Sequence, residues 1–144
     1  MPSATQTNVQ AGDYPVTAGE VLTDMEARLA MIDNSSGEPV AKLPAAVTDD
    51  VTAVITEGAA SGSPATLRPL TPAQQARVIL KGACDSGDRL CMADPATPAD
   101  KGKVRTVPEA NGTYIVVAIA EETGVDGQHV KLRPYGPLSV TVSS

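Results

Sequence analysis

Few residues of this 144-residue chain are of the types that carry out chemistry, and the single histidine is the first to consider. His129 lies in residues 127–132, where apolar and polar residues alternate as in a strand. A metal site or a proton-transfer pair there would need a second histidine or nearby carboxylates, which the sequence does not place beside it. We therefore interpret His129 as a solvent-facing structural residue.

The carboxylates form short clusters that do not predict catalysis. The pairs Asp49-Asp50 and Glu121-Glu122 fall at expected strand ends, where neighbouring side chains point to opposite faces of a sheet. Residues 85–88 hold two aspartates beside a glycine but lack the spacing of an EF-hand loop. The sequence has no phosphate-binding loop, dinucleotide fingerprint or nucleophile elbow. It thus predicts no enzyme, no cofactor and no metal.

Cys84 and Cys91 flank the turn-like residues 85–88, so they could face each other across a hairpin. Two thiols alone do not make a zinc site. In a cytosolic product reduced thiols are favoured over a disulfide, and a disulfide formed after cell lysis stays open as the alternative.

The composition predicts a core of small side chains. The chain is 42% hydrophobic but has no Trp, no Phe and only three Tyr. Small aliphatic side chains remove less surface from water than aromatic rings do. We therefore expect partner surfaces to complete the stability of the fold.

The net charge of −6 and the pI near 4.6 argue against a nucleic-acid partner, because phosphates would be repelled and no basic stripe compensates. No stretch of the sequence is long and apolar enough to predict a membrane span. Residues 1–8 lack the basic and apolar parts of a signal peptide. We expect synthesis in a cytoplasm, no nucleic acid and no membrane.

Two passages of the chain echo each other and predict an internal duplication. Glu57 and residues 67–70 (LRPL) match Glu121 and residues 132–135 (LRPY), at offsets of 121 − 57 = 64 and 132 − 67 = 65. Upstream, residues 18–22 are matched with 86–90, and residues 37–42 with 102–106. Repetition at a fixed period is typical of units that share a core, so it favours a scaffold over a catalyst.

Short runs of Val, Ile, Leu and Thr, separated by Gly, Pro, Asp and Asn, predict an all-β fold. We expect a compact β-sandwich or barrel-like domain made of two similar β-rich halves. The expected strands are residues 20–23, 28–32, 39–43, 51–57 and 65–70, then 77–83, 88–93, 103–107, 113–121, 128–135 and 138–142. A helix over residues 24–32 and one helical turn over residues 71–76 are the competing local interpretations.

Five segments carry more specific expectations. Residues 114–120 are apolar on both faces and predict a central strand covered on two sides, whereas residues 51–56 predict a wetter counterpart. Because proline cannot donate to a sheet ladder, residues 67–70 and 132–135 are expected to end strands or run along edges. The loop at residues 94–102, which holds two prolines, is expected to be a surface contact region.

Residues 1–13 are polar and aperiodic and predict an extended N-terminal arm. A first half over residues 14–72 and a second half over residues 73–144 are expected to follow. We expect Thr7, Asn8, Val9 and Tyr14 to contact a partner surface or another subunit, with Val9 and Tyr14 as the apolar points.

Four short motifs follow one another in order: residues 17–22 (TAGEVL), 86–90 (SGDRL), 102–104 (GKV) and 117–121 (VAIAE). In this order and repetition the chain resembles, over residues 16–135, the capsid decoration proteins, which are small cement proteins on the heads of tailed bacteriophages. The resemblance implies a β-rich fold with an N-terminal arm and no catalytic residues. It also implies attachment in many copies to the exterior of the virion capsid, with the major capsid protein as partner and self-association, commonly as trimers.

Two other functional classes remain open. One is another phage structural module, such as a tail or fibre component or a receptor- or carbohydrate-binding β-domain. Tyr14, Tyr114 and Tyr135 side by side on one open face would favour it. The other is an enzyme of a different type, which a polar pocket with converging carboxylates of perturbed pKa would favour.

Overall fold

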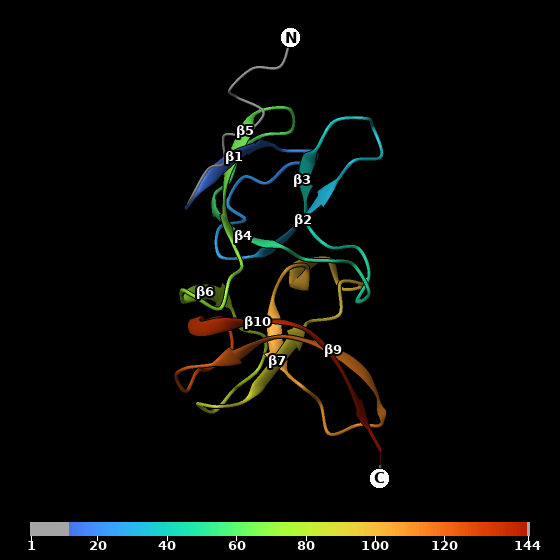
Figure 1. Ribbon diagram of the computed structural model, residues 1–144, viewed down its shortest axis with the longest axis vertical. Coiled ribbons are helices and arrows are strands. Elements are labelled where there is room, and N and C mark those ends of the chain that lie inside the picture. Colours follow the sequence, from blue (N-terminus) through green and yellow to red (C-terminus); the bar gives the residue numbers. More distant parts are fainter. Residues whose placement is uncertain (1–11, 144) are drawn as a thin grey trace.

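Short strands make up nearly all of the regular structure in the computed structural model, which describes residues 12–143, with residues 136–139 described by their backbone only. The predicted all-β class with two similar halves is confirmed, and the halves lie end to end (Figure 1). The first sheet holds β1 (Tyr14–Thr17), β2 (Leu29–Asp33), β3 (Val40–Lys42), β4 (Ala53–Glu57) and β5 (Pro64–Pro69). The second holds β6 (Ala76–Ile79), β7 (Arg89–Met92), β8 (Val104–Thr106), β9 (Gly112–Ala120) and β10 (His129–Val142), with a short 3₁₀ helix, η2 (Pro98–Asp100), between β7 and β8.

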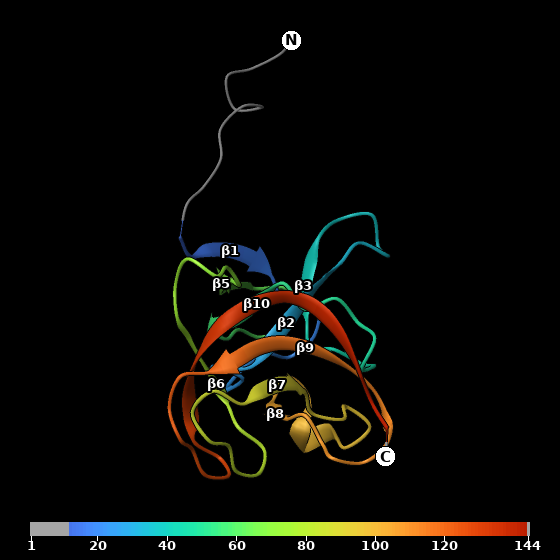
Figure 2. The same cartoon turned by 60° about the horizontal axis from the view of Figure 1, so that its bottom comes forward.

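The two sheets have the same topology. The strand order is β1-β5-β4-β2-β3 in the first and β6-β10-β9-β7-β8 in the second, and Figure 2 shows β10, β9, β7 and β8 one below another. Each sheet curls until its outer strands approach, through parallel bridges between Ala18 and Ala41 and between Leu80 and Val104. Each half is therefore a small, nearly closed barrel, and the duplication holds at the level of topology.

The pairing corrects the predicted alignment of the repeat. Leu67 and Leu132 are equivalent as expected, because they pair with equivalent positions of β4 and β9. Residues 86–90, however, do not match residues 18–22. The Gly87 amide donates to the Ala120 carbonyl as the Ala27 amide donates to the Ile55 carbonyl, so Gly87 matches Ala27. The turn before this point is longer in the first half, so a single offset cannot hold along the whole repeat.

Equivalent positions fill the two cores with side chains of different size. The first core contains Ala18, Leu22, Ala30, Ala41, Ala53, Ile55, Ala65 and Leu67. The corresponding residues of the second core are Leu80, Cys84, Leu90, Val104, Ala118, Ala120, Val130 and Leu132. Each buried methylene contributes about 0.8 kcal/mol, so the alanine-rich first core is the weaker of the two.

The first half also completes the second core. Ala53 and Ile55 face the first core, and Val54 between them points to the other side of the sheet, where it joins Leu29 in the second core. The Ile79 amide donates to the Ala27 carbonyl, and the Leu29 amide donates to the Gly102 carbonyl, each at 2.8 Å. The two halves therefore share apolar packing and backbone hydrogen bonds.

The loop at residues 94–102 takes part in this junction, while Asp94 and residues 96–99 stay exposed, so its role as a surface contact region stays a prediction. Arg28 Nη1 donates to the carbonyls of Ala99 at 3.0 Å and Lys101 at 2.8 Å. Asp100 is only 6% exposed and forms ion pairs with Lys81 and Lys103. The loop thus fastens the halves to each other.

The predicted strand over residues 20–23 is wrong, and the competing helical interpretation of residues 24–32 does not hold. Residues 20–23 belong to a connection, and the first strand is β1. Residues 24–32 cannot be one helix, because Asp24 and Ala27 have φ values of 62° and 63°, outside the right-handed helical region. Residues 71–74 form one turn, in which the Gln74 amide donates to the Thr71 carbonyl at 3.3 Å, and β6 starts at Ala76.

The strand covered on both faces is β4 and not β9, although both are central. Ala53, Val54 and Ile55 of β4 are all buried, because this strand lies between the two cores. In β9 the residues that alternate with the core positions, Ile115, Val117 and Ile119, are only half-buried. The prediction that β9 is more buried than β4 is therefore reversed.

The strands that contain Pro69 and Pro134 are interior strands, contrary to the edge expectation. β1 stops pairing at Leu67 and β6 stops at Leu132, so neither proline faces a neighbouring strand on that side. Pro69 ends β5, as predicted, and the register of β10 against β9 shifts after Pro134. Both prolines sit where a ladder stops or is irregular, which removes the cost of the missing donor.

Candidate binding surfaces

A groove of about 470 Å³ opens at the junction of the halves and is lined by basic side chains. Its first-half wall includes Glu26, Val54 and Arg68, and its second-half wall includes Arg77, His129 and Lys131. We call it the cationic groove. His129 is exposed at the start of β10, in agreement with its predicted solvent-facing position.

Ion pairs neutralise part of the charge in the cationic groove. Arg68 donates to both carboxylate oxygens of Asp13, at 2.9 and 3.2 Å, and this hydrogen bond lowers the pKa of Asp13. Arg77 Nη1 lies 3.1 Å from Glu122 Oε1. The pKa of Glu122 is lowered chiefly by the backbone amide of Lys131, and the Arg77 charge adds to this. The Lys131 ammonium has no ion pair among the described residues.

A second groove at the junction, of about 440 Å³, is mainly apolar. Its lining comes from both halves and includes Val51, Leu70, Ile115, Val117 and Tyr135, with Asp49 and Asp50 also at its wall. We call it the apolar groove. Tyr135 is 45% exposed there. The groove has the shape and composition of a protein-contact surface, because a few polar groups flank half-buried aliphatic side chains.

Comparison with solved structures identifies a neighbour with a similar fold. The chain is similar to the head fiber gp8.5 N base of bacteriophage phi29. The TM-score is 0.61 at 19% sequence identity, over 85% of this chain and 92% of that chain. At this identity the similarity shows a shared fold. No family model matches the sequence, and no curated protein matches it.

The acidic pairs do not form a dyad in the described structure. Asp49 accepts the amides of Ala45 and Ala46, at 2.7 and 3.0 Å, and so closes a turn. Glu121 accepts hydrogen bonds from Gln75 and Arg133, which lower the pKa of its carboxyl. A general acid needs a raised pKa, whereas the pKa values of Glu121 and Glu122 are both lowered.

The cysteines are free and buried, and they lie on opposite sides of the second sheet. Cys84 belongs to the second core, whereas Cys91 pairs with Arg105 on the outer side. Burial raises the pKa of both thiols, which disfavours the reactive thiolate. Within residues 12–143 no cluster of three or more His, Cys, Asp or Glu side chains could hold a metal ion.

The predicted contact residues fall into two groups. Thr7, Asn8 and Val9 lie outside the described residues. Tyr14 is half-buried in β1, packs against the first core and pairs with Leu67. The expectation that these four residues contact the capsid or another subunit stays a prediction.

The three tyrosines occupy different environments. Tyr14 packs against the first core, the Tyr114 hydroxyl donates to the Ala110 carbonyl at 2.9 Å, and Tyr135 lines the apolar groove. This arrangement does not supply the shared aromatic platform that a carbohydrate site usually needs.

Sequence reasoning missed both grooves. In the sequence, Arg68 and the segment that contains Pro134 stand out only as repeated motifs. The one sequence signal that could have pointed to the grooves is the LRP motif, which recurs once in each half. Only tertiary packing places both copies at the junction. No helix among the described residues is long and apolar enough to cross a membrane.

Proposed function

We propose that this chain is a structural protein of a tailed-bacteriophage head. In particular, it acts as a decoration protein that binds the major capsid protein on the outer surface of the shell and stabilises the mature shell. The observation that carries the proposal is the fold shared with a phage head fiber base over 85% of the chain. The ordered motifs that resemble decoration proteins support the same assignment, and both favour a position on the virion exterior.

The physical basis of such a role is multivalency. A subunit that touches several shell subunits binds through contacts that are individually modest, but linking them gives a high effective concentration. Because the added subunit binds only the assembled lattice, it shifts the equilibrium towards the assembled shell by mass action. A homotrimer multiplies these contacts again and is the proposed form. No catalysis and no cofactor are part of the proposal.

The N-terminal segment is the proposed anchor on the shell. Residues 1–11 should be deleted, and not residues 1–13, because Asp13 pairs with Arg68 and β1 starts at Tyr14. We expect the truncated chain to keep its circular dichroism spectrum and its unfolding midpoint but to lose co-sedimentation with shells that lack the protein. The full chain is the matched control and should raise the temperature at which those shells disassemble. Wild-type binding by the truncated chain would refute the anchor, and no binding by the full chain would refute the decoration role.

A second candidate is the base of a longer head fibre, which the nature of the structural neighbour favours. Cryo-microscopy of particles with and without this chain separates the two roles. A decoration protein adds one compact two-barrel density at each site. A fibre base adds the same density at the foot of a rod made by another protein.

A further inference from the structure

Charge is divided unevenly between the two halves. Residues 1–72 contain nine acidic and three basic side chains (3 − 9 = −6), whereas residues 73–144 contain eight of each (8 − 8 = 0). The whole net charge of the protein therefore resides in the first half. The second half has no net charge, but its basic side chains are not spread evenly over its surface.

Five of the chain's 11 basic side chains occupy the outer face of the second sheet. Arg89 and Arg133 both lie opposite Ile119, Arg77 lies opposite Lys131, and Arg105 lies opposite Cys91. Directly paired residues point to the same side of a sheet, and these positions alternate with the buried residues Val78, Leu90, Val104, Val130 and Leu132. We call this surface, formed by Arg77, Arg89, Arg105, Lys131 and Arg133, the basic face.

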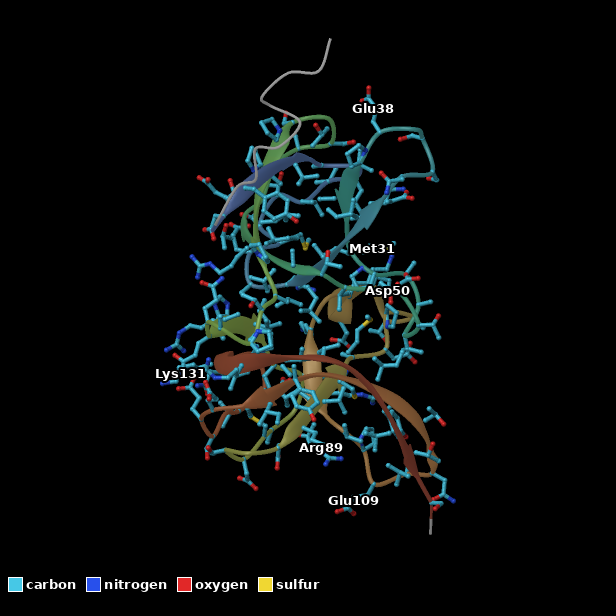
Figure 3. All side chains as sticks on the ribbon, viewed as in Figure 1. Met31, Glu38, Asp50, Arg89, Glu109 and Lys131 are labelled. Carbon is cyan, nitrogen blue, oxygen red and sulfur yellow. The ribbon has the colours of Figure 1, made fainter. Side chains whose placement is uncertain are left out.

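The basic face keeps uncompensated charge. Glu122 pairs with Arg77 and Glu121 with Arg133, each at 3.1 Å. Arg89 and Lys131 have no ion pair among the described residues. In Figure 3, Arg89 lies on the side of the second half away from the first half, and Glu38 lies at the opposite end of the molecule.

The first half carries the complementary charge. Five of its exposed carboxylates have no ion pair within the described part of the chain, and these are Asp24, Glu26, Glu38, Asp50 and Glu57. Two whole molecules repel each other, but at physiological salt the Debye length of about 8 Å limits the interaction to the surfaces that face each other. Opposed surfaces of opposite sign then attract and fix orientation.

We infer that the basic face docks on the acidic first half of a second copy of this chain. The contact joins two different surfaces, so it is head-to-tail, and it closes into a ring when the rotation between copies permits. A closed ring of three is the form that fits the proposed homotrimer. The inference rests on the self-association in the proposed function but does not depend on binding to the shell.

The test uses sedimentation velocity of the full chain and two charge variants. Arg89→Glu reverses an unpaired charge of the basic face. Lys101→Glu, at a residue with no ion pair among those described, makes the same change in net charge elsewhere in the second half and is the matched control. All variants are first checked by circular dichroism.

We expect the wild-type chain to associate at about 0.15 M salt and to dissociate at about 1 M salt, where the Debye length is about 3 Å. The basic-face variant should associate at least about tenfold more weakly than the matched control, because like charges then face each other. A wild-type monomer at every salt concentration would overturn both the self-association and this inference. Equal association by the basic-face variant and the matched control would overturn the inference alone.

A mixing experiment tests whether the contact is head-to-tail. A third variant, in which Asp24 and Asp50 become Asn and Glu26, Glu38 and Glu57 become Gln, loses the unpaired carboxylates of the first half but keeps the basic face. Alone, this variant and the basic-face variant should each be monomeric. Mixed, they should form one-to-one dimers that grow no further, because each supplies the one surface that the other lacks. A mixture that stays monomeric would overturn the head-to-tail contact.

Discussion

Ala27 has a left-handed backbone conformation, and the equivalent residue in the other half is a glycine. Ala27 has φ 63°, and the equivalent Gly87 has φ 94°. A residue with a Cβ in this region costs roughly 1 to 2 kcal/mol, and the extra chain entropy of glycine offsets part of that difference. The junction bond from the Ile79 amide to the Ala27 carbonyl holds this conformation in place.

We expect Ala27→Gly to raise the free energy of unfolding by about 0.5 to 1 kcal/mol, since relief of the left-handed strain exceeds the entropy cost. Urea unfolding at constant m-value measures the change. The control is Ala60→Gly, at an exposed position that has no positive φ, and it should be neutral or destabilising. An unfolding free energy of Ala27→Gly below that of the wild type would contradict the strain argument.

Asp100 makes stability depend on pH. The hydrogen bond from Lys81 lowers the pKa of this carboxyl, and Lys103 adds to the effect. Since the folded pKa lies below the unfolded value, the stabilisation is present above the unfolded pKa of about 4 and is lost as the pH falls below it. Asp100→Asn should therefore lower stability at neutral pH and flatten its decline in acid.

Thermal unfolding between neutral pH and about pH 3 measures this difference. Asp50→Asn, which alters an exposed carboxylate with no ion pair among the described residues, is the matched control. Parallel pH profiles for Asp100→Asn and the wild type would show that Asp100 does not contribute.

At the scale of elements, the segment between β7 and β8 needs a glycine at position 102 because it packs closely against the first half. Gly102 has φ +80°, and a Cβ there would lie 2.9 Å from Arg28 Cβ and 2.9 Å from the Leu29 carbonyl oxygen. Both contacts belong to the other half of the chain. Gly37, in the corresponding connection between β2 and β3, has φ +92°, and a Cβ there would meet no atom within 4 Å.

These two glycines separate backbone strain from contact at the junction. Gly37→Ala should cost about 1 to 2 kcal/mol through strain alone. Gly102→Ala should cost at least about 1 kcal/mol more, because Arg28 and Leu29 must also move. Chemical denaturation of both variants gives the difference, and equal losses would mean that the junction accommodates the extra carbon.

In the molecule as a whole, the second barrel depends on the first. Val54 is 3% exposed and Leu29 is 1% exposed, and both complete the second core from outside its own sheet. We therefore expect the chain to unfold in one cooperative transition. Val54→Ala should lower the free energy of unfolding by roughly 2 kcal/mol, from lost burial and the cavity left behind.

Hydrogen exchange provides the measurement that locates this effect. Amides of β9 in the second half should lose protection when Val54, in the first half, is truncated. Val16→Ala, at a residue that packs against the first core, should also lower the protection of β9, in proportion to its own loss of unfolding free energy, if the chain unfolds in one transition. Loss of protection restricted to the first sheet in the Val54 variant would show that the halves unfold independently.

Much of the element content follows from local patterning. Runs such as residues 114–120 predict strands because apolar residues with β propensity recur between turn-forming residues. The errors lie where partners outside the segment decide the outcome. The same holds for the helix that was the alternative to a strand within residues 24–32, because Leu29 and Ala30 are buried on opposite sides of a strand, one in each core.

The candidate surfaces were less accessible to prediction than the strands. Each groove takes its lining from both halves, so its residues are distant in sequence. The basic face likewise assembles from β6, β7, β8 and β10, whose residues alternate between inward and outward positions. A net charge taken from the sequence cannot reveal that a sheet collects basic side chains on one side.

The all-β class, the duplication and the small-residue core can be established from the amino-acid sequence, because they depend on periodicity and composition along the chain. The correspondence between repeats, the strand that is buried on both faces and the places where charge gathers became clear only from the packing of the two halves. The reason is that the first sheet packs its outer side onto the second core. Burial at that contact depends on residues from another barrel, which no local pattern records.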